Sequence, residues 1–156
     1  MAENTNNELA VRDAEVIAVT KPNDVVGFEI PDGYICTLDR NTVEGKLDIM
    51  NALNGAESLA DHVGEVFDLK GFITTPGVRA VSHNDCTNTY LVMADGSTFM
   101  SQSDGVATCV RNLAAIFRQE DGTVKLGEDG TLPICCIEIP LKNGKTMKKL
   151  VTPKQQ

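Results

Sequence analysis

Three short apolar runs, separated by turn residues, follow the polar first dozen residues of the chain. The runs EVIAVT at 15–20, VVGFEI at 25–30 and YICTLD at 34–39 are rich in β-branched and aromatic residues, which are typical of strands. Between them lie KPND and PDG, whose Pro, Asn, Asp and Gly residues favour turns. The pattern therefore predicts three short strands in the first 40 residues.

A helical period replaces the β pattern in NTVEGKLDIMNALNG, at 41–55. Asn41 or Thr42 is placed to cap a helix, and Gly55 is placed to end it. Gly45 weakens the pattern, because a glycine inside a helix costs about 1 kcal/mol relative to alanine. A helix is still the best interpretation, since apolar side chains recur at helical spacing at Val43, Leu47, Met50 and Leu53.

The segment EVFDLKGFITT, at 65–75, alternates and predicts a strand. Strict alternation places Phe67, Leu69 and Ile73 on one face, and it places Asp68, Lys70, Phe72 and Thr74 on the other. The second face is polar apart from Phe72, so it is the expected solvent side. There Lys70 would offer a cation to a phosphate and Phe72 a ring to a base. The alternative is that Phe72 packs under a helix. The segment that follows, 76–88, has the composition of a functional loop.

The clearest element is the hairpin TYLVMADGSTFMSQ, at 89–102, in which Asp-Gly marks the turn. Phe99 shares a face with Ser97 and Ser101 if the strand alternates. A core strand rarely has serines on both sides of its ring. We therefore expect Phe99 on the surface, with its ring free to stack on a flat ligand, and the alternative is that it fills a local pocket.

A second helix and a last hairpin complete the chain. The helix starts near Ser103 or Asp104 and carries an apolar stripe for packing on a sheet, at Val106, Val110, Leu113 and Phe117. The hairpin joins PICCIEIPL to KTMKKLVT through a turn at KNG. It carries a basic strip formed by Lys142, Lys145, Lys148 and Lys149. Such lysines could bind phosphates, or they could protect a sheet edge from aggregation.

The length of 156 residues suits one domain, which we expect at 13–151 between flexible ends at 1–12 and 152–156. The composition, with 42% apolar residues, is that of a globular protein. No apolar run is long enough to span a membrane and the first residues are polar, so we expect a cytoplasmic protein. The net charge of -8 argues against indiscriminate phosphate binding but leaves room for a local basic strip.

Metal and catalytic chemistry are poorly represented. The five cysteines include no CxxC pair, and the two histidines form no ligand-spaced cluster with them, so neither zinc nor a disulfide scaffold is expected. The chain has no nucleophile elbow, phosphate loop, dinucleotide fingerprint or HExxH motif. We therefore expect no cofactor and no enzymatic activity.

The order of these elements resembles the single-stranded DNA-binding proteins of protein-primed tailed phages that infect Bacillus. The resemblance covers about residues 38–150, and it rests on LDRNTVEGKLDIMNALNGAESL, GEVFDLKGFITT, TYLVMADGSTFMSQSDGVATCVRNL and ICCIEIPLKNGKTMKKL. It is sharpest in ADGSTFMSQSDGVA, where the family has the same turn, an aromatic residue two positions after the serine, and the start of the same helix. The first 30 or so residues extend beyond the short family members.

The resemblance implies an oligonucleotide-binding fold that coats the displaced strand during phage DNA replication. The family's tyrosine after the turn falls on Phe99, which keeps the ring. A second family tyrosine falls near Thr74 or Thr75, where this chain has no ring, and Phe72 is the neighbouring candidate to replace it. The N-terminal extension could hold a homo-oligomer together or complete the barrel.

Taken together, the sequence predicts an α+β protein with a partly open, OB-like core of five or more strands that binds single-stranded DNA. The predicted nucleic-acid-binding residues are Phe99, Phe72, Lys70, Tyr90, Arg79, Lys142, Lys145, Lys148 and Lys149. Phage DNA polymerase and further copies of the chain are open as partners. Two alternative functions also stay open: an accessory protein whose acidic surface binds a host protein, and a small-ligand domain built on the loop from Pro76 to Thr87.

Overall fold

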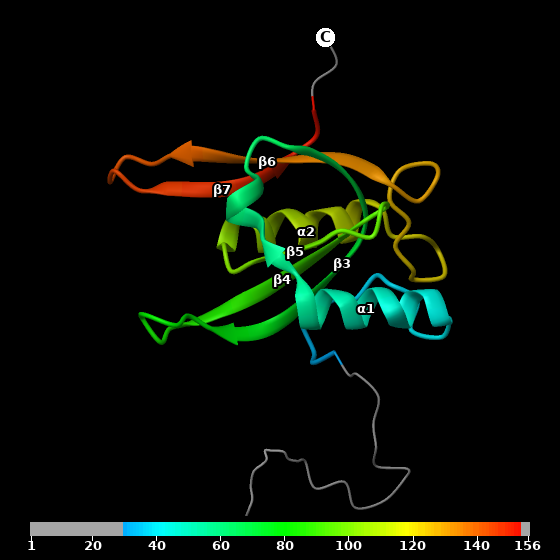
Figure 1. Ribbon diagram of the computed structural model, residues 1–156. Helices are drawn as coiled ribbons and strands as arrows, with labels where there is room; N and C mark the ends of the chain where they lie inside the picture. Colours follow the sequence, from blue (N-terminus) through cyan, green and yellow to red (C-terminus); the bar gives the residue numbers. More distant parts are fainter. Residues whose placement is uncertain (1–29, 154–156) are drawn as a thin grey trace, which may run out of the picture.

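A curled sheet of six strands organises residues 30–153, the part of the chain that the computed structural model describes (Figure 1). The strands follow the order β2-β5-β4-β3-β6-β7, and all neighbours are antiparallel except β2 and β5. Their bounds are β2 Glu57–Ser58, β3 Val66–Val78, β4 Asp85–Met93, β5 Thr98–Ser101, β6 Leu132–Pro140 and β7 Thr146–Val151. The predicted α+β, OB-like fold class is confirmed.

The predicted strand at 15–20, most of the one at 25–30, and the predicted flexible start at 1–12 lie outside the described residues. The third predicted strand, at 34–39, is reduced to a single bridge between Cys36 and Ile73. Two backbone bonds flank that bridge, from Thr37 N to the carbonyl of Phe72 and from Thr74 N to the carbonyl of Ile35. Residues 35–37 therefore run along the edge of β3 that β6 leaves free.

Helix α1, Val43–Gly55, confirms the first predicted helix, and Thr42 caps it by accepting a hydrogen bond from the amide of Gly45. Its buried face consists of Gly45, Ile49 and Ala52. The larger side chains whose spacing predicted the helix lie mostly outside, since Val43, Leu47 and Met50 are exposed. Small residues face inward because the helix lies close to its neighbours: a β-carbon on Gly45 would overlap the carbonyl of Asp39.

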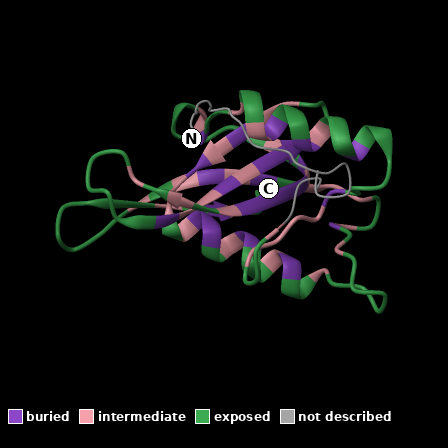
Figure 2. Cartoon of the chain, turned by 90° about the horizontal axis from the view of Figure 1, so that it is seen from below, coloured by how far each residue is buried: buried purple, intermediate pink, exposed green. Residues whose placement is uncertain are grey.

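The two main helices lie on opposite faces of the sheet, and Figure 2 shows the strands between them with exposed hairpin tips beyond. Helix α2, Asp104–Ile116, packs on β4 and β7 through Val106, Ala107, Val110 and Ala114. A short 3-10 helix, η2 (Leu59–His62), adds Leu59 to the same core. Helix α1 covers a smaller cluster on the other face. No helix in 30–153 is long and apolar enough to cross a membrane.

A β-bulge between Leu69 and Gly71 reverses the faces of β3. Before the bulge, Phe67 and Leu69 point toward α2, and after it Phe72 does so, while Ile73 packs on the α1 side. Strict alternation predicted the opposite faces for Phe72 and Ile73, and that prediction is wrong because the bulge inserts one extra residue. Strands β3 and β4 also extend further than expected, so the predicted loop at 76–88 is mostly paired and only 79–84 connect them.

Candidate nucleic-acid interface

Phe99 is a core residue, 3% exposed, which contradicts the expected surface position. It lies opposite Leu91, and its ring centroid is 4.6 Å from that of Phe67. The serines on its face misled the prediction, because Ser101 is itself buried. Ser101 pairs with Thr89, which pairs with Thr74, and the three form a buried row of small hydroxyl side chains.

Phe72 and Lys70 do not form the expected exposed pair of ring and cation. Phe72 is fully buried, opposite Leu91. Lys70 points the other way, where its Nζ lies 2.8 Å from carboxylate oxygens of both Asp48 and Glu44 on α1. The hydrogen bonds to Asp48 and Glu44 raise the pKa of Lys70. The bond between Lys70 and Glu44 also lowers the pKa of the Glu44 carboxyl. The charge of Lys70 therefore holds α1 on the sheet.

The basic strip of the last hairpin is only partly free. Lys142, Lys145 and Lys149 are exposed. Lys148 is half-buried on the opposite face of β7 from Lys149, and its Nζ lies 3.7 Å from a carboxylate oxygen of Glu138. Three of the four predicted lysines therefore remain accessible to a phosphate.

Tyr90 lies on the α1 face of the sheet, opposite Ile73 on β3, and it is half-buried at the edge of the α1 cluster. Asn88, two residues before it on β4, shares that face and lies opposite Thr75. The side chain of Gln102, just beyond β5, donates a 2.9 Å hydrogen bond to Asn88. This end of the sheet thus presents a ring beside polar side chains.

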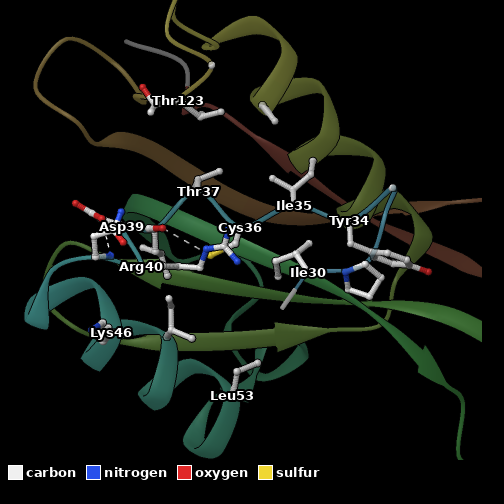
Figure 3. A pocket seen from close by; sticks show the side chains of 18 of the residues that line it. Ile30, Tyr34, Ile35, Cys36, Thr37, Asp39, Arg40, Lys46, Leu53 and Thr123 are labelled. Carbon is white, nitrogen blue, oxygen red and sulfur yellow. Dashed lines mark hydrogen bonds between the residues drawn. The ribbon is translucent and has the colours of Figure 1, made fainter. Parts of the chain in front are cut away.

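Tyr34 belongs to the same face, although the sequence pattern did not single it out. Cys36 bridges to Ile73 and packs on the α1 cluster, so alternation assigns Tyr34, two residues before Cys36, to the same side. Figure 3 shows Ile35 pointing toward α2, with the ring of Tyr34 beside it. We call this surface the tyrosine face and define it as Tyr34, Thr75, Asn88, Tyr90 and Gln102.

A cleft of about 1470 Å³ begins at Tyr34 and runs between α1 and the end of α2 (Figure 3). Three basic residues line it, namely Arg40, Lys46 and Arg118, together with the acidic Asp32 and Asp39. Its apolar wall includes Ile49, Met50 and Leu53 of α1. A chain of alternating rings and phosphates would find both apolar and cationic groups along this path.

Sequence reasoning missed Tyr34, Arg40, Lys46 and Arg118 as site residues. The available signal was the tyrosine count: the chain has two tyrosines and no tryptophan, so each tyrosine is a rare stacking group. Arg79, which was predicted, lies where β3 ends, and its Nη2 donates a 3.1 Å bond to the carbonyl of Gln102. Among the described residues, no group of three His, Cys, Asp or Glu side chains is placed to hold a metal ion.

Comparison with known proteins gives one family. The sequence model of the Phi29 phage family, described as phage single-stranded DNA-binding protein, matches residues 29–150. No match was found among curated proteins or among solved structures. The matched range contains all of the tyrosine face and the cleft.

Proposed function

Because this chain belongs to the phage single-stranded DNA-binding protein family and binds single-stranded DNA, we propose that it coats displaced strands during phage DNA replication and holds them on the tyrosine face. Bases would stack on Tyr34 and Tyr90, at roughly 1 to 3 kcal/mol per base without regard to sequence. This assignment replaces Phe99 and Phe72, whose rings have no accessible face.

The observation that carries the proposal is that Tyr90 is only half-buried, at the edge of the cluster that α1 covers, on the face to which the register assigns Tyr34. Open sheet surfaces with accessible rings suit single strands, since unpaired bases expose their π faces while duplex bases are already stacked. Asn88, Thr75 and Gln102 supply hydrogen-bonding groups on the same face.

The cleft extends the proposed path beyond Tyr34. Arg40, Lys46 and Arg118 line it and would balance the charge of the sugar-phosphate backbone. The exposed lysines of the β6–β7 hairpin, Lys142, Lys145 and Lys149, form a second basic surface that would attract the same strand. Local cations of this kind allow an acidic protein to bind DNA.

Binding, with no catalytic step, is the role we propose, and host cytoplasm is the place where replicating phage DNA would meet the protein. Phage DNA polymerase is a proposed partner, because a coated strand must remain accessible to it. Further copies of this chain are also proposed partners, since coating a strand places them side by side.

The proposal is tested by fluorescence anisotropy with labelled single-stranded and duplex oligonucleotides of equal length, at two salt concentrations. Binding should be tighter to the single strand. Tyr90→Ala should weaken binding by roughly 1 to 3 kcal/mol, while Tyr90→Phe should bind like the natural chain because stacking requires only the ring. Equal affinity for single strand and duplex, or an unaffected Tyr90→Ala variant, would overturn the proposal.

A further inference from the structure

Gln102 connects three segments at the end of the sheet that lies beyond α1. Its Nε2 lies 3.4 Å from the carbonyl oxygen of Val78 and 2.9 Å from Oδ1 of Asn88. A backbone carbonyl can only accept, so the Gln102 atom that faces Val78 must be the amide nitrogen. This backbone contact fixes the orientation of the Gln102 side chain.

The same reasoning fixes the amide of Asn88. The Gln102 nitrogen can only donate, so the Asn88 atom that faces it must be Oδ1, and Nδ2 points elsewhere. Within residues 30–153, no acceptor is bonded to this Nδ2, and it is not among the buried atoms that lack a partner. Asn88 therefore presents two N–H donors at the surface, in a fixed direction.

Gly77 makes room for that amide. A β-carbon at Gly77 would lie 2.7 Å from Nδ2 of Asn88 and closer still to the other atoms of the amide, so any side chain at position 77 would displace it. The backbone of Gly77 has no positive φ. Space for Asn88, rather than backbone strain, is thus the structural reason for a glycine here.

The side chain of Arg79 is held by Gln102. Its Nη2 donates to the carbonyl oxygen of Gln102 at 3.1 Å and lies 3.4 Å from Oδ1 of Asp104. These contacts use one nitrogen of the guanidinium, and the side chain is 35% exposed. The guanidinium therefore has further N–H groups that these contacts do not use, and Gln102 connects Arg79 to Asn88.

We propose that Asn88 and Arg79 form a seat for one phosphate of the bound strand. Both present donors only, and a phosphate presents acceptors only, so the chemistry is complementary. Tyr90 is two residues from Asn88 on the same face, at about 7 Å along the strand, which lets one nucleotide stack its base and anchor its phosphate. This inference rests on the proposed function and specifies where the backbone of the strand lies.

The test compares Asn88→Asp with Asn84→Asp in binding to a labelled oligo(dT). Asp at 88 keeps the acceptor for Gln102 and replaces only the outward donors, while Asn84 is exposed in the same hairpin and its side chain bonds to no residue of the described range. Both changes add the same charge. We expect Asn88→Asp to weaken binding at least about tenfold more than Asn84→Asp, with unchanged melting temperatures. Equal effects would overturn the phosphate seat.

Two further arms separate the interpretations. Gly77→Ala should also weaken binding, because it moves the amide without altering Asn88. On an abasic strand of the same length, the ratio of the affinities of the two Asp variants should be the same as on oligo(dT). If this ratio falls to one on the abasic strand, Asn88 contacts a base, and the phosphate assignment is overturned. If Tyr90→Ala weakens binding while the two Asp variants are equal, the tyrosine face stands and the seat alone fails.

Discussion

Phe99 lies directly opposite Leu91 across β5 and β4, and Leu91 in turn lies opposite Phe72 on β3. All three side chains are 3% exposed or less, so they form one continuous row of the core beneath α2. The ring that the family resemblance assigns to base stacking is therefore a packing residue in this chain. Truncating a core side chain lowers the stability of the fold, whereas truncating a side chain that binds DNA lowers the affinity for DNA.

Phe99→Ala should destabilise the fold by about 3 to 5 kcal/mol, because it leaves a cavity between Leu91 and Phe67. The folded fraction should bind single-stranded DNA as the natural chain does. Denaturant unfolding and DNA binding, measured on one preparation, check both parts. A variant with intact stability and lost affinity would return Phe99 to the DNA surface.

The elements that rest on local signals could be predicted from the sequence. Thr42 as a helix cap and Asp95-Gly96 as a hairpin turn act within a few residues, and both structures formed where expected. The faces of β3 could not be predicted, because no local signal distinguishes the bulge at Gly71 from ordinary alternation. One extra residue moved Phe72 from the expected surface into the core.

The tyrosine face was also beyond sequence reasoning, for a different reason. Tyr34 and Tyr90 are 56 positions apart, and they share a face only because the segment at Cys36 and strand β4 both pair with β3. Pairing between distant segments is set by the whole sheet. Tyr90 could be predicted as a site residue from the sequence, whereas Tyr34 could be assigned to this face only from the strand register.

Basic residues should differ in their effect on the salt dependence of binding. Replacing Lys142, Lys145 and Lys149 together by alanine should lower the slope of log K against log salt by up to about 2, at about 0.7 for each phosphate contact on a single strand. Lys148→Ala is the control, since that lysine lies on the same hairpin but faces the other way, with its Nζ 3.7 Å from a carboxylate oxygen of Glu138. Titrations at several salt concentrations check this. A slope that is unchanged in the triple variant would assign these lysines to solubility alone.

His62 should make stability depend on pH. Its ring nitrogens lie 2.9 Å from Glu57 and 3.0 Å from Glu65, and these hydrogen bonds, chiefly that of Glu57, raise its pKa above the ordinary value of about 6.5. The folded state therefore holds the proton more tightly than the unfolded state. This stabilisation is complete below about pH 6.5 and is lost as the pH rises through the raised folded-state pKa.

The measurement for His62 is the melting temperature of the natural chain and of His62→Gln at about pH 6 and about pH 9. The gap between the two proteins should be larger at the lower pH, because only there is the imidazolium present to bind both carboxylates. A gap of equal size at the two pH values would show that the ring acts by packing against Phe99, whose centroid is 4.6 Å away.

The central claim, that bases stack on the tyrosine face, is tested most directly by intrinsic fluorescence. The chain has two tyrosines and no tryptophan, so its emission reports on Tyr34 and Tyr90 alone. Titration with oligo(dT) should quench the emission, and in Tyr34→Phe and Tyr90→Phe the one remaining tyrosine should still be quenched, because each ring stacks on a base of its own. Unchanged emission at saturation, with binding confirmed by anisotropy on the same samples, would contradict the account.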